Sequence, residues 1–366
     1  MEDCLRLETD AARHPDSGLN SLSDNAMSES VQAIPPFAEA PPAFSYSQAL
    51  RPTVGEWIRH SLLFVITVGS TTFAGIFVAA PNLDTSLPEP STLLSYLLYI
   101  PQYYSQTVIN YLSFAILNPH VLEQGLIFSA SLLTILLSHE MGHYIACRRY
   151  GVSATLPFFI PAPPLFIAGT FGAFIKIRSP IPTRRALFDI GLAGPLAGFI
   201  ALLPIAVAGV LSMGLPTAGS GHDIVFNDPL LLRLLARALG VRLEPYSPTN
   251  PYYMAAWIGL LVTSLNLMPV GQLDGGHGTF ALFGAHAHRW IGRIAFVLMA
   301  VIAVLGWFWH GSPSGFLYTI LLAIMLKVRH PQPQVMEPLG NKRILISLLT
   351  LIVFALSFWP FPITIS

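Results

Sequence analysis

The chain has 366 residues, of which 53% are hydrophobic and only 10% are charged, and its formal net charge is zero. A soluble domain carries about 25% charged residues, so this composition indicates an integral membrane protein and gives no support for nucleic-acid binding. The two cysteines, Cys4 and Cys147, are too few for a disulfide framework or a cysteine-based zinc site, so any metal ligands must be His, Asp or Glu.

The N-terminal stretch differs in composition from the rest of the chain. Residues 1–52 are polar, rich in Ser and Pro and poor in aromatic side chains, which predicts a disordered tail on the cytoplasmic side. Residues 53–366 are predicted to form one multi-span membrane domain. The fold class that we expect is therefore an all-α polytopic membrane protein.

Apolar runs predict about seven transmembrane helices. In chain order they occupy about residues 61–80, 123–147, 185–213, 253–268, 290–309, 314–328 and 344–360. Tyr-rich segments at 96–100 and 103–117 are predicted to be interfacial helices, and residues 230–239 a short amphipathic helix. With the N-terminus in the cytoplasm, all but three of the 19 Lys and Arg residues fall on the cytoplasmic side, which favours that orientation.

Residues 153–182 are apolar but hold six prolines, which excludes a spanning helix there. Within this segment, residues 171–178 are rich in residues that favour strands, and Gly169 marks a bend. We therefore expect a short membrane-associated β-hairpin after the second span. Its candidate functional residues are Gly169, Phe171, Gly172 and Phe174.

The second predicted span carries His139-Glu140-Met141-Gly142-His143 near its end. A helix turns about 100° per residue, so the two histidines lie on one face, one turn apart. Two imidazoles in this arrangement can share a zinc ion, with the Glu140 carboxylate beside the metal. Ionisable groups are costly inside a membrane, at about 2.5–3.5 kcal/mol each, which indicates that they serve a purpose.

A zinc ion in a catalytic site takes three protein ligands, and Asp274 is the candidate for the third. It follows the fourth predicted span, on a Gly-flanked segment that the topology places on the same side of the membrane as the histidines. Irregular backbone at that depth is tolerated where protein or a water cavity surrounds it. The alternative interpretation is that Asp274 caps a short helix beginning near Gly275.

The combination of His139-Glu140-Met141-Gly142-His143, Asn266-Leu267-Met268-Pro269 and Leu273-Asp274-Gly275-Gly276 resembles the site-2 protease family of intramembrane zinc metalloproteases. The resemblance covers roughly residues 123–285, the expected catalytic core. It implies one Zn²⁺ per chain, held by His139, His143 and Asp274, with Glu140 as the general base. The third and fourth spans are too close in sequence for the PDZ domain that some members carry.

The resemblance also implies that the substrates are membrane-spanning segments of other proteins within the lipid bilayer. Asn266 is a candidate second donor to the developing oxyanion, and its alternative role is to satisfy backbone groups at a helix end. The hairpin could hold a substrate as an extended strand, or it could only plug the cytoplasmic face. A bacterial inner membrane and an organellar membrane are both compatible with the sequence.

A multi-span ion or metal transporter is the competing interpretation, because intramembrane His, Asp and Glu also mark ion pathways. Three further residues have open roles. His277 either contacts Asp274 or is a solvated or hydrogen-bonded histidine, and Asp189 is expected to complement a helix N-terminus. Gly194, followed by Pro195, is expected to serve helix packing or a kink.

Overall fold

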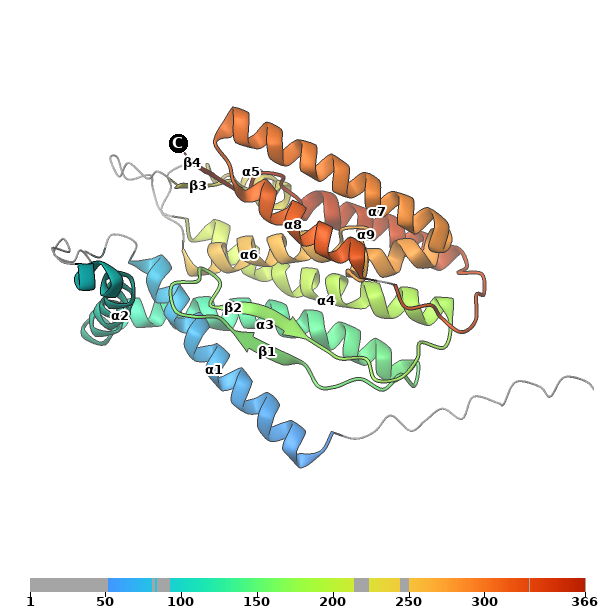
Figure 1. Cartoon of the computed structure of the whole chain (residues 1–366), viewed down its shortest axis with the longest axis horizontal. Coiled ribbons are helices and arrows are strands. Elements are labelled where there is room, and N and C mark those ends of the chain that lie inside the picture. The colour runs from blue at the N-terminus through green and yellow to red at the C-terminus, as the bar shows by residue number, and fades with distance from the viewer. Residues whose placement is uncertain are drawn as a thin grey trace, which may run out of the picture. The chain divides into compact units, whose positions relative to one another are not determined.

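The computed structural model describes residues 52–80, 83, 93–213, 224–243, 250–328 and 330–365, so almost all of the predicted N-terminal tail lies outside the described residues. The described part is mainly helical (Figure 1). In chain order its elements are α1 (Val54–Ala79), α2 (Leu93–Leu117), α3 (Pro119–Arg149), β1 (Phe158–Pro161), β2 (Thr170–Phe174), α4 (Arg184–Leu211), β3 (Ile224–Phe226), α5 (Leu230–Leu239), α6 (Pro251–Asn266), α7 (Asp274–His310), α8 (Ser314–Lys327), α9 (Asn341–Ser357) and β4 (Ile363–Ile365).

Four of these helices, α1, α3, α4 and α7, are long and apolar enough to cross a membrane. The helix α8 is apolar but shorter, and α6 and α9 have 16 and 17 residues. A perpendicular crossing takes about 20 apolar residues. The structure therefore bears out an α-helical membrane protein, and the count of about seven spans stays a prediction.

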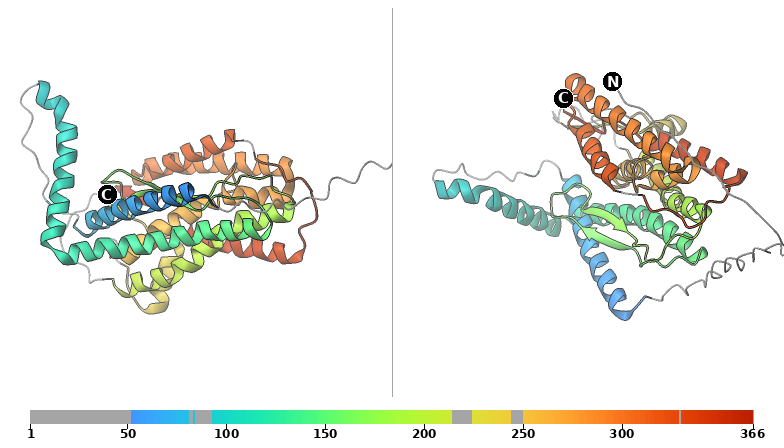
Figure 2. Two further views of the ribbon diagram at one scale, coloured as in Figure 1. Left: turned by 90° about the horizontal axis from the view of Figure 1, so that it is seen from below. Right: turned by 45° about the vertical axis from the view of Figure 1, so that its right-hand side comes forward.

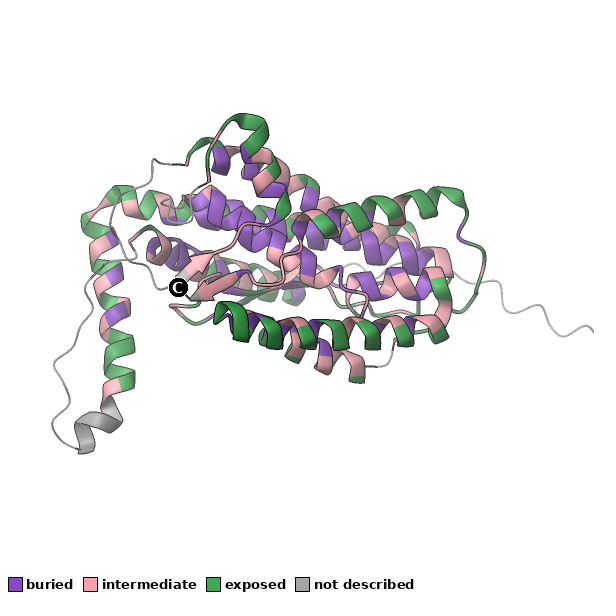
Figure 3. Ribbon diagram, turned by 90° about the horizontal axis from the view of Figure 1, so that it is seen from above, coloured by how far each residue is buried: buried purple, intermediate pink, exposed green. Residues whose placement is uncertain are grey.

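The helices α3, α4 and α6 form the centre of the helical packing, with α1 and the β1–β2 sheet on one side and α7, α8 and α9 on the other (Figure 1). Buried residues concentrate in this centre, whereas the outer faces of the flanking helices are exposed (Figure 3). These outer faces are rich in Leu, Ile, Val and Trp, as expected for a surface covered by lipid. The first part of α2 extends away from the other helices (Figure 2).

Contact between α3 and α4 is close because small residues line it. A Cβ at Gly142 would lie 2.8 Å from the carbonyl carbon of Ala193, and closer still to its oxygen, so only glycine fits there. Small residues that let two backbones approach are a common feature of membrane helix pairs. This contact brings the backbone of α4 directly against the motif on α3.

The proline-rich segment forms a two-stranded antiparallel sheet in which Phe158 pairs with Phe174 and Phe159 with Ala173. The sheet packs against α1, and its second strand also contacts α3. The strand β2 begins one residue before the stretch predicted from sequence and ends earlier, at Phe174. A second small sheet pairs β3 with the C-terminal strand β4.

Two predicted boundaries differ from the structure. The helix α2 continues through Pro101, where two interfacial helices were expected, as proline is tolerated in membrane-associated helices when neighbours satisfy the freed carbonyls. The span predicted from about residue 290 is the second half of α7, which already begins at Asp274 and bends at Gly284. The positive φ of 79° at Gly284 is a conformation that suits glycine.

Candidate metal centre

His139, His143 and Asp274 meet in the interior of the protein. The Nε2 atoms of the two histidines lie 3.1 Å apart, and Oδ2 of Asp274 lies 3.1 Å from Nε2 of His139 and 3.3 Å from Nε2 of His143. All three side chains are largely shielded from solvent, with exposed fractions of 6%, 10% and 16%. The fold thus brings together two segments that are far apart along the chain.

These three distances fit a tetrahedral zinc site. Zinc binds imidazole nitrogen and carboxylate oxygen at about 2.0–2.2 Å, so neighbouring ligand atoms around a tetrahedral ion are about 3.3 Å apart. The three ligand atoms form one face of such a tetrahedron, which leaves the fourth position open. In the described part of the chain, this is the one group of His, Cys, Asp and Glu side chains with metal-site spacing.

The backbone of α4 fixes how His143 presents its nitrogen. Its Nδ1 lies 2.7 Å from the carbonyl oxygen of Ile190, so Nδ1 carries the proton and donates it to that carbonyl. In a neutral imidazole the proton on Nδ1 leaves a lone pair on Nε2, the atom that faces Asp274 and His139. Metal-binding histidines are held in this way, by a carbonyl or carboxylate on the other ring nitrogen.

A row of glycines on α4 makes room for the histidines. A Cβ at Gly194 would lie 2.5 Å from Cε1 of His143 and nearer still to Nε2 and Cδ2. A Cβ at Gly198 would lie 3.1 Å from Cβ of His139. The packing role expected for Gly194 is therefore specific, because the imidazole of His143 lies directly against its Cα.

Asp274 is the first residue of α7, directly after the turn that follows α6. The N-cap of α7 is Leu273, and no side chain caps this end. The capping role considered for Asp274 is thus not the one that its carboxylate has in the structure, where it faces the two histidines. A Cβ at Gly275 would lie 2.9 Å from the carbonyl oxygen of Met268, so a glycine is needed where α7 folds back on the turn.

Glu140 and Asn266 lie at the edge of the same centre. Oε1 of Glu140 is 4.0 Å from Nε2 of His139, and its side chain is 9% exposed. Nδ2 of Asn266, the last residue of α6, lies 3.4 Å from Nε2 of His139, so its amide points to the centre. Both predicted catalytic residues therefore lie within 4.0 Å of one of the three candidate ligand atoms.

The strand β2 leads to this centre. Ile175, the residue after β2, makes a backbone hydrogen bond to Glu140. The side chains of Phe171 and Phe174 are 55% and 46% exposed, and Gly169 lies tightly against the backbone of Ser70 and Thr71 in α1. The candidate substrate-binding residues thus lie in or directly before a strand whose end contacts the predicted base. Among the described residues, we see no hydrogen bond from their side chains to the three ligand candidates.

His277 takes the second of the two roles considered for it, that of a hydrogen-bonded histidine. Its Nδ1 lies 2.8 Å from Nε2 of His330, whose ring stacks on Phe280 with the centroids 4.2 Å apart. His277 therefore joins α7 to the segment after α8 rather than hydrogen bonding to Asp274.

Comparison with known proteins agrees with this geometry. A family model described as peptidase family M50 matches residues 127–306, which hold all three ligand candidates, Glu140 and Asn266. The chain is 34% identical over 263 residues to "Probable zinc metalloprotease EGY1, chloroplastic" of Oryza sativa subsp. japonica, and 30% identical over 262 residues to the protein of that name from Arabidopsis thaliana. The first alignment covers 69% of this chain and 42% of the rice protein, and the second covers 69% and 44%.

A third relative, "Probable zinc metalloprotease EGY2, chloroplastic" of Oryza sativa subsp. indica, is 32% identical over 193 residues, which is 51% of this chain and 34% of that protein. The chain thus spans less than half the length of these curated relatives. No solved structure matches the chain. The names of the relatives agree with zinc as the cofactor and do not favour the transporter interpretation.

Proposed function

Because the chain belongs to peptidase family M50, we propose that it is an intramembrane zinc metalloendopeptidase that hydrolyses peptide bonds within or near membrane-spanning segments of other proteins. The observation that carries this proposal is the buried face of three ligand atoms, 3.1–3.3 Å apart, with a carboxylate 4.0 Å from one of them. Such proteolysis would release fragments of substrates from the membrane. We further expect the cleavage to occur near the cytoplasmic side.

In this proposal His139, His143 and Asp274 hold the zinc ion. When bound, zinc supplies a Lewis acid that polarises the scissile carbonyl and makes a water molecule acidic near neutral pH. The carbonyl of Ile190 keeps the Nε2 lone pair of His143 directed at the ion. Burial of the ligands excludes bulk water, which would otherwise screen their charges.

Glu140 is the general base of the proposed reaction. Its carboxylate takes the proton of the attacking water and returns it to the amine that leaves, a role for which it must lie within reach of the open position. Asn266 projects its amide to the same side and would donate a hydrogen bond to the oxygen that gains negative charge.

Substrate is proposed to bind as an extended strand along β2. A substrate helix hides its carbonyls in its own hydrogen bonds, so it must unwind before it can be cleaved. In the described part of the chain β2 pairs with β1 alone, which leaves backbone groups for an added strand, and its end reaches Glu140 through Ile175. Pairing along β2 would compensate the substrate for its lost helical hydrogen bonds.

The proposed function is tested by expressing the full chain with a panel of single-span proteins and comparing it with Glu140→Gln. We expect fragments to be released from at least one substrate by the wild type and from none by the variant. Zinc content should be equal in the two proteins, because Gln keeps the size of the side chain and Glu140 is not a ligand. Cleavage at the wild-type rate by the variant would show that Glu140 is not the base.

The role of β2 has a separate test in Phe174→Pro. Proline removes a backbone N–H from the strand, so we expect slower cleavage of an intact spanning segment. A short unstructured peptide with the same scissile bond needs less unwinding, and its cleavage should change little. Equal rates for both substrates in the variant and the wild type would refute strand addition at β2.

A further inference from the structure

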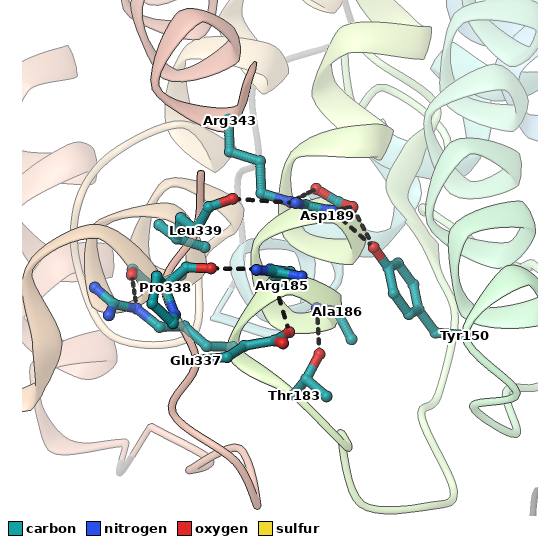
Figure 4. Close-up of polar contacts among 11 residues, drawn as sticks. Tyr150, Thr183, Arg185, Ala186, Asp189, Glu337, Pro338, Leu339 and Arg343 are labelled. Carbon is teal, nitrogen blue, oxygen red and sulfur yellow. Dashed lines mark hydrogen bonds and ion pairs between the residues drawn. The ribbon is translucent and has the colours of Figure 1, made fainter. Parts of the chain in front are cut away.

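A polar network of three side chains joins α3, α4 and α9 (Figure 4). Arg343, in the first turn of α9, donates from Nε to Oδ1 of Asp189 at 2.8 Å and from Nη2 to Oδ2 at 2.6 Å. Tyr150, the residue directly after α3, donates its hydroxyl proton to Oδ2 of the same carboxylate. The Nη2 group of Arg343 also lies 3.1 Å from the Tyr150 hydroxyl, so each of the three side chains contacts the other two.

This arrangement differs from the role expected for Asp189 at a helix N-terminus. The helix α4 begins at Arg184 and is capped by Thr183, so Asp189 lies in its second turn. There its carboxylate is held by a planar, two-pronged pair with Arg343, which fixes direction as well as distance. Burial, and then Asp189, raises the pKa of the Tyr150 phenol above its ordinary value, so this hydroxyl remains a donor.

The network lies one residue away from the contact that orients His143. Asp189 directly precedes Ile190, whose carbonyl accepts the Nδ1 proton of His143. Tyr150 follows His143 by about two helical turns on the same rigid segment. The Tyr150–Asp189 and His143–Ile190 hydrogen bonds therefore join the same two stretches of chain, and the first restrains the geometry of the second.

The first part of α4 precedes a proline in the helix, Pro195. Pro195 has no N–H to donate to the carbonyl of Gly191, and its ring pushes that carbonyl away, so a helix bends most easily at this point. On the face toward α3, the neighbouring contacts are made by Gly142 and Gly194, which have no side chains to interlock. The hydrogen bonds of Asp189 therefore add a directional restraint on the neighbouring Ile190 to the packing of the buried side chains around it.

We propose that Asp189, Tyr150 and Arg343 are positioning residues that hold the first two turns of α4 against the end of α3, so that the Ile190 carbonyl stays aligned with His143. Arg343 makes this alignment depend on α9, near the C-terminus of the chain. The inference rests on the proposed metal-binding role of His143. In this proposal the three side chains contact neither the metal nor the substrate.

The test measures zinc affinity, by competition with a chelator, on the full chain purified in detergent. Asp189→Asn keeps the shape of the side chain but loses its charge and one acceptor, and we expect affinity to fall about 10–100-fold, as when partners of metal-binding histidines are removed. The visible spectrum of the Co²⁺-loaded protein should change as well, because it reports ligand geometry. Tyr150→Phe removes a single hydrogen bond and should have a smaller effect in the same direction.

Arg185→Gln is the matched control. Arg185 lies on the same turns of α4 and also contacts the segment before α9, through the Pro338 carbonyl at 2.9 Å and Glu337 at 3.5 Å (Figure 4). Among the described residues the Arg185 side chain makes no hydrogen bond or ion pair to the Asp189 side chain, so its loss should leave zinc affinity within about twofold even where thermal stability falls.

Suppose that Asp189→Asn and Tyr150→Phe bind zinc as tightly as the wild type and Arg185→Gln, and that their Co²⁺ spectra match that of the wild type. This result would overturn the positioning role and leave the proposed function intact. A wild-type chain that binds no zinc would overturn the proposed function itself, and the inference with it. Arg343→Lys adds a further distinction. Lysine keeps the charge but lacks the planar guanidinium group, so we expect this variant to bind zinc more weakly than the wild type does. Wild-type affinity in Arg343→Lys would refute the geometric argument.

Discussion

The substitution Gly194→Ala adds a single methyl group against the imidazole of His143. The new Cβ would lie 2.5 Å from Cε1 of the ring, whereas ordinary contacts begin at 3.4 Å. The ring or the helix must therefore retreat by about 1 Å. Because Ala is the better helix former, by about 0.5–1 kcal/mol, α4 itself gains stability, and any loss must come from the contact with His143.

A displacement of about 1 Å is large for this centre. His143 is held between Ile190 at 2.7 Å and Asp274 at 3.3 Å, so a shift away from Gly194 disturbs both contacts at once. Misplacement of a catalytic group by about 1 Å costs on the order of 100-fold in rate. Overpacking in a tight interior adds about 1–3 kcal/mol of strain. We expect zinc affinity to fall at least about tenfold and the rate of proteolysis about 100-fold.

The assay measures zinc bound per chain and the rate at which a single-span substrate is cut. Two glycine-to-alanine variants serve as controls. Gly198→Ala places its Cβ 3.1 Å from Cβ of His139, which requires a shift of only a few tenths of an ångström, and Gly69→Ala meets nothing within 4 Å. The expected order of loss is Gly194, then Gly198, then Gly69. Full zinc content and cleavage within twofold of wild type for Gly194→Ala would refute the reasoning.

Three further predictions follow from the same geometry. Asp274→Ala removes one of the three proposed ligands, so zinc affinity measured against a chelator should fall more than about 100-fold, beyond the loss of about 10–100-fold expected when a partner of a metal-binding histidine is removed. Asn266→Ala should keep zinc and lower the cleavage rate by about 10²–10³-fold, as for the loss of an oxyanion donor, and an unchanged rate would remove that role. Burial lowers the pKa of His330 to about 3, so as pH falls below about 6.5, protonation favours the form in which His330 has left its site beside His277. The protection factors of residues 330–340, which are exchange rates corrected for the intrinsic pH dependence of amide exchange, should accordingly be lower at pH 5 than at pH 7 in the wild type but not in His330→Phe.

The motif on α3 could be predicted from the sequence because helical spacing is a local property. His139 and His143 fall on one face whatever surrounds them. Predicting Asp274 as the third ligand required two further arguments. One was a topology that places two distant segments on the same side of the membrane, and the other was the resemblance to known proteases. The roles of these residues in binding and catalysis stay predictions, although the structure brings them together.

Other parts of the centre could not be predicted from single residues. The partner of His143 is a backbone carbonyl, and every residue has one, so nothing in the sequence distinguishes Ile190. The small residues of α4 were visible as a pattern of close packing, but the pattern does not say that an imidazole lies against Gly194. The Asp189–Arg343 pair joins helices far apart in sequence, and such a pairing follows from the assembled fold alone.

The position of Asp274 at the start of α7 has a consequence for the time at which the protein can become active. During synthesis the ribosome delivers His139 and His143 long before Asp274, and a nascent chain that ends before α7 has two of the three proposed ligands. Such a chain lacks the complete group of three side chains, so under the proposed function it could not yet cleave the polypeptides inserted beside it. Biogenesis itself would thus delay the proposed hydrolysis until the later helices are in place.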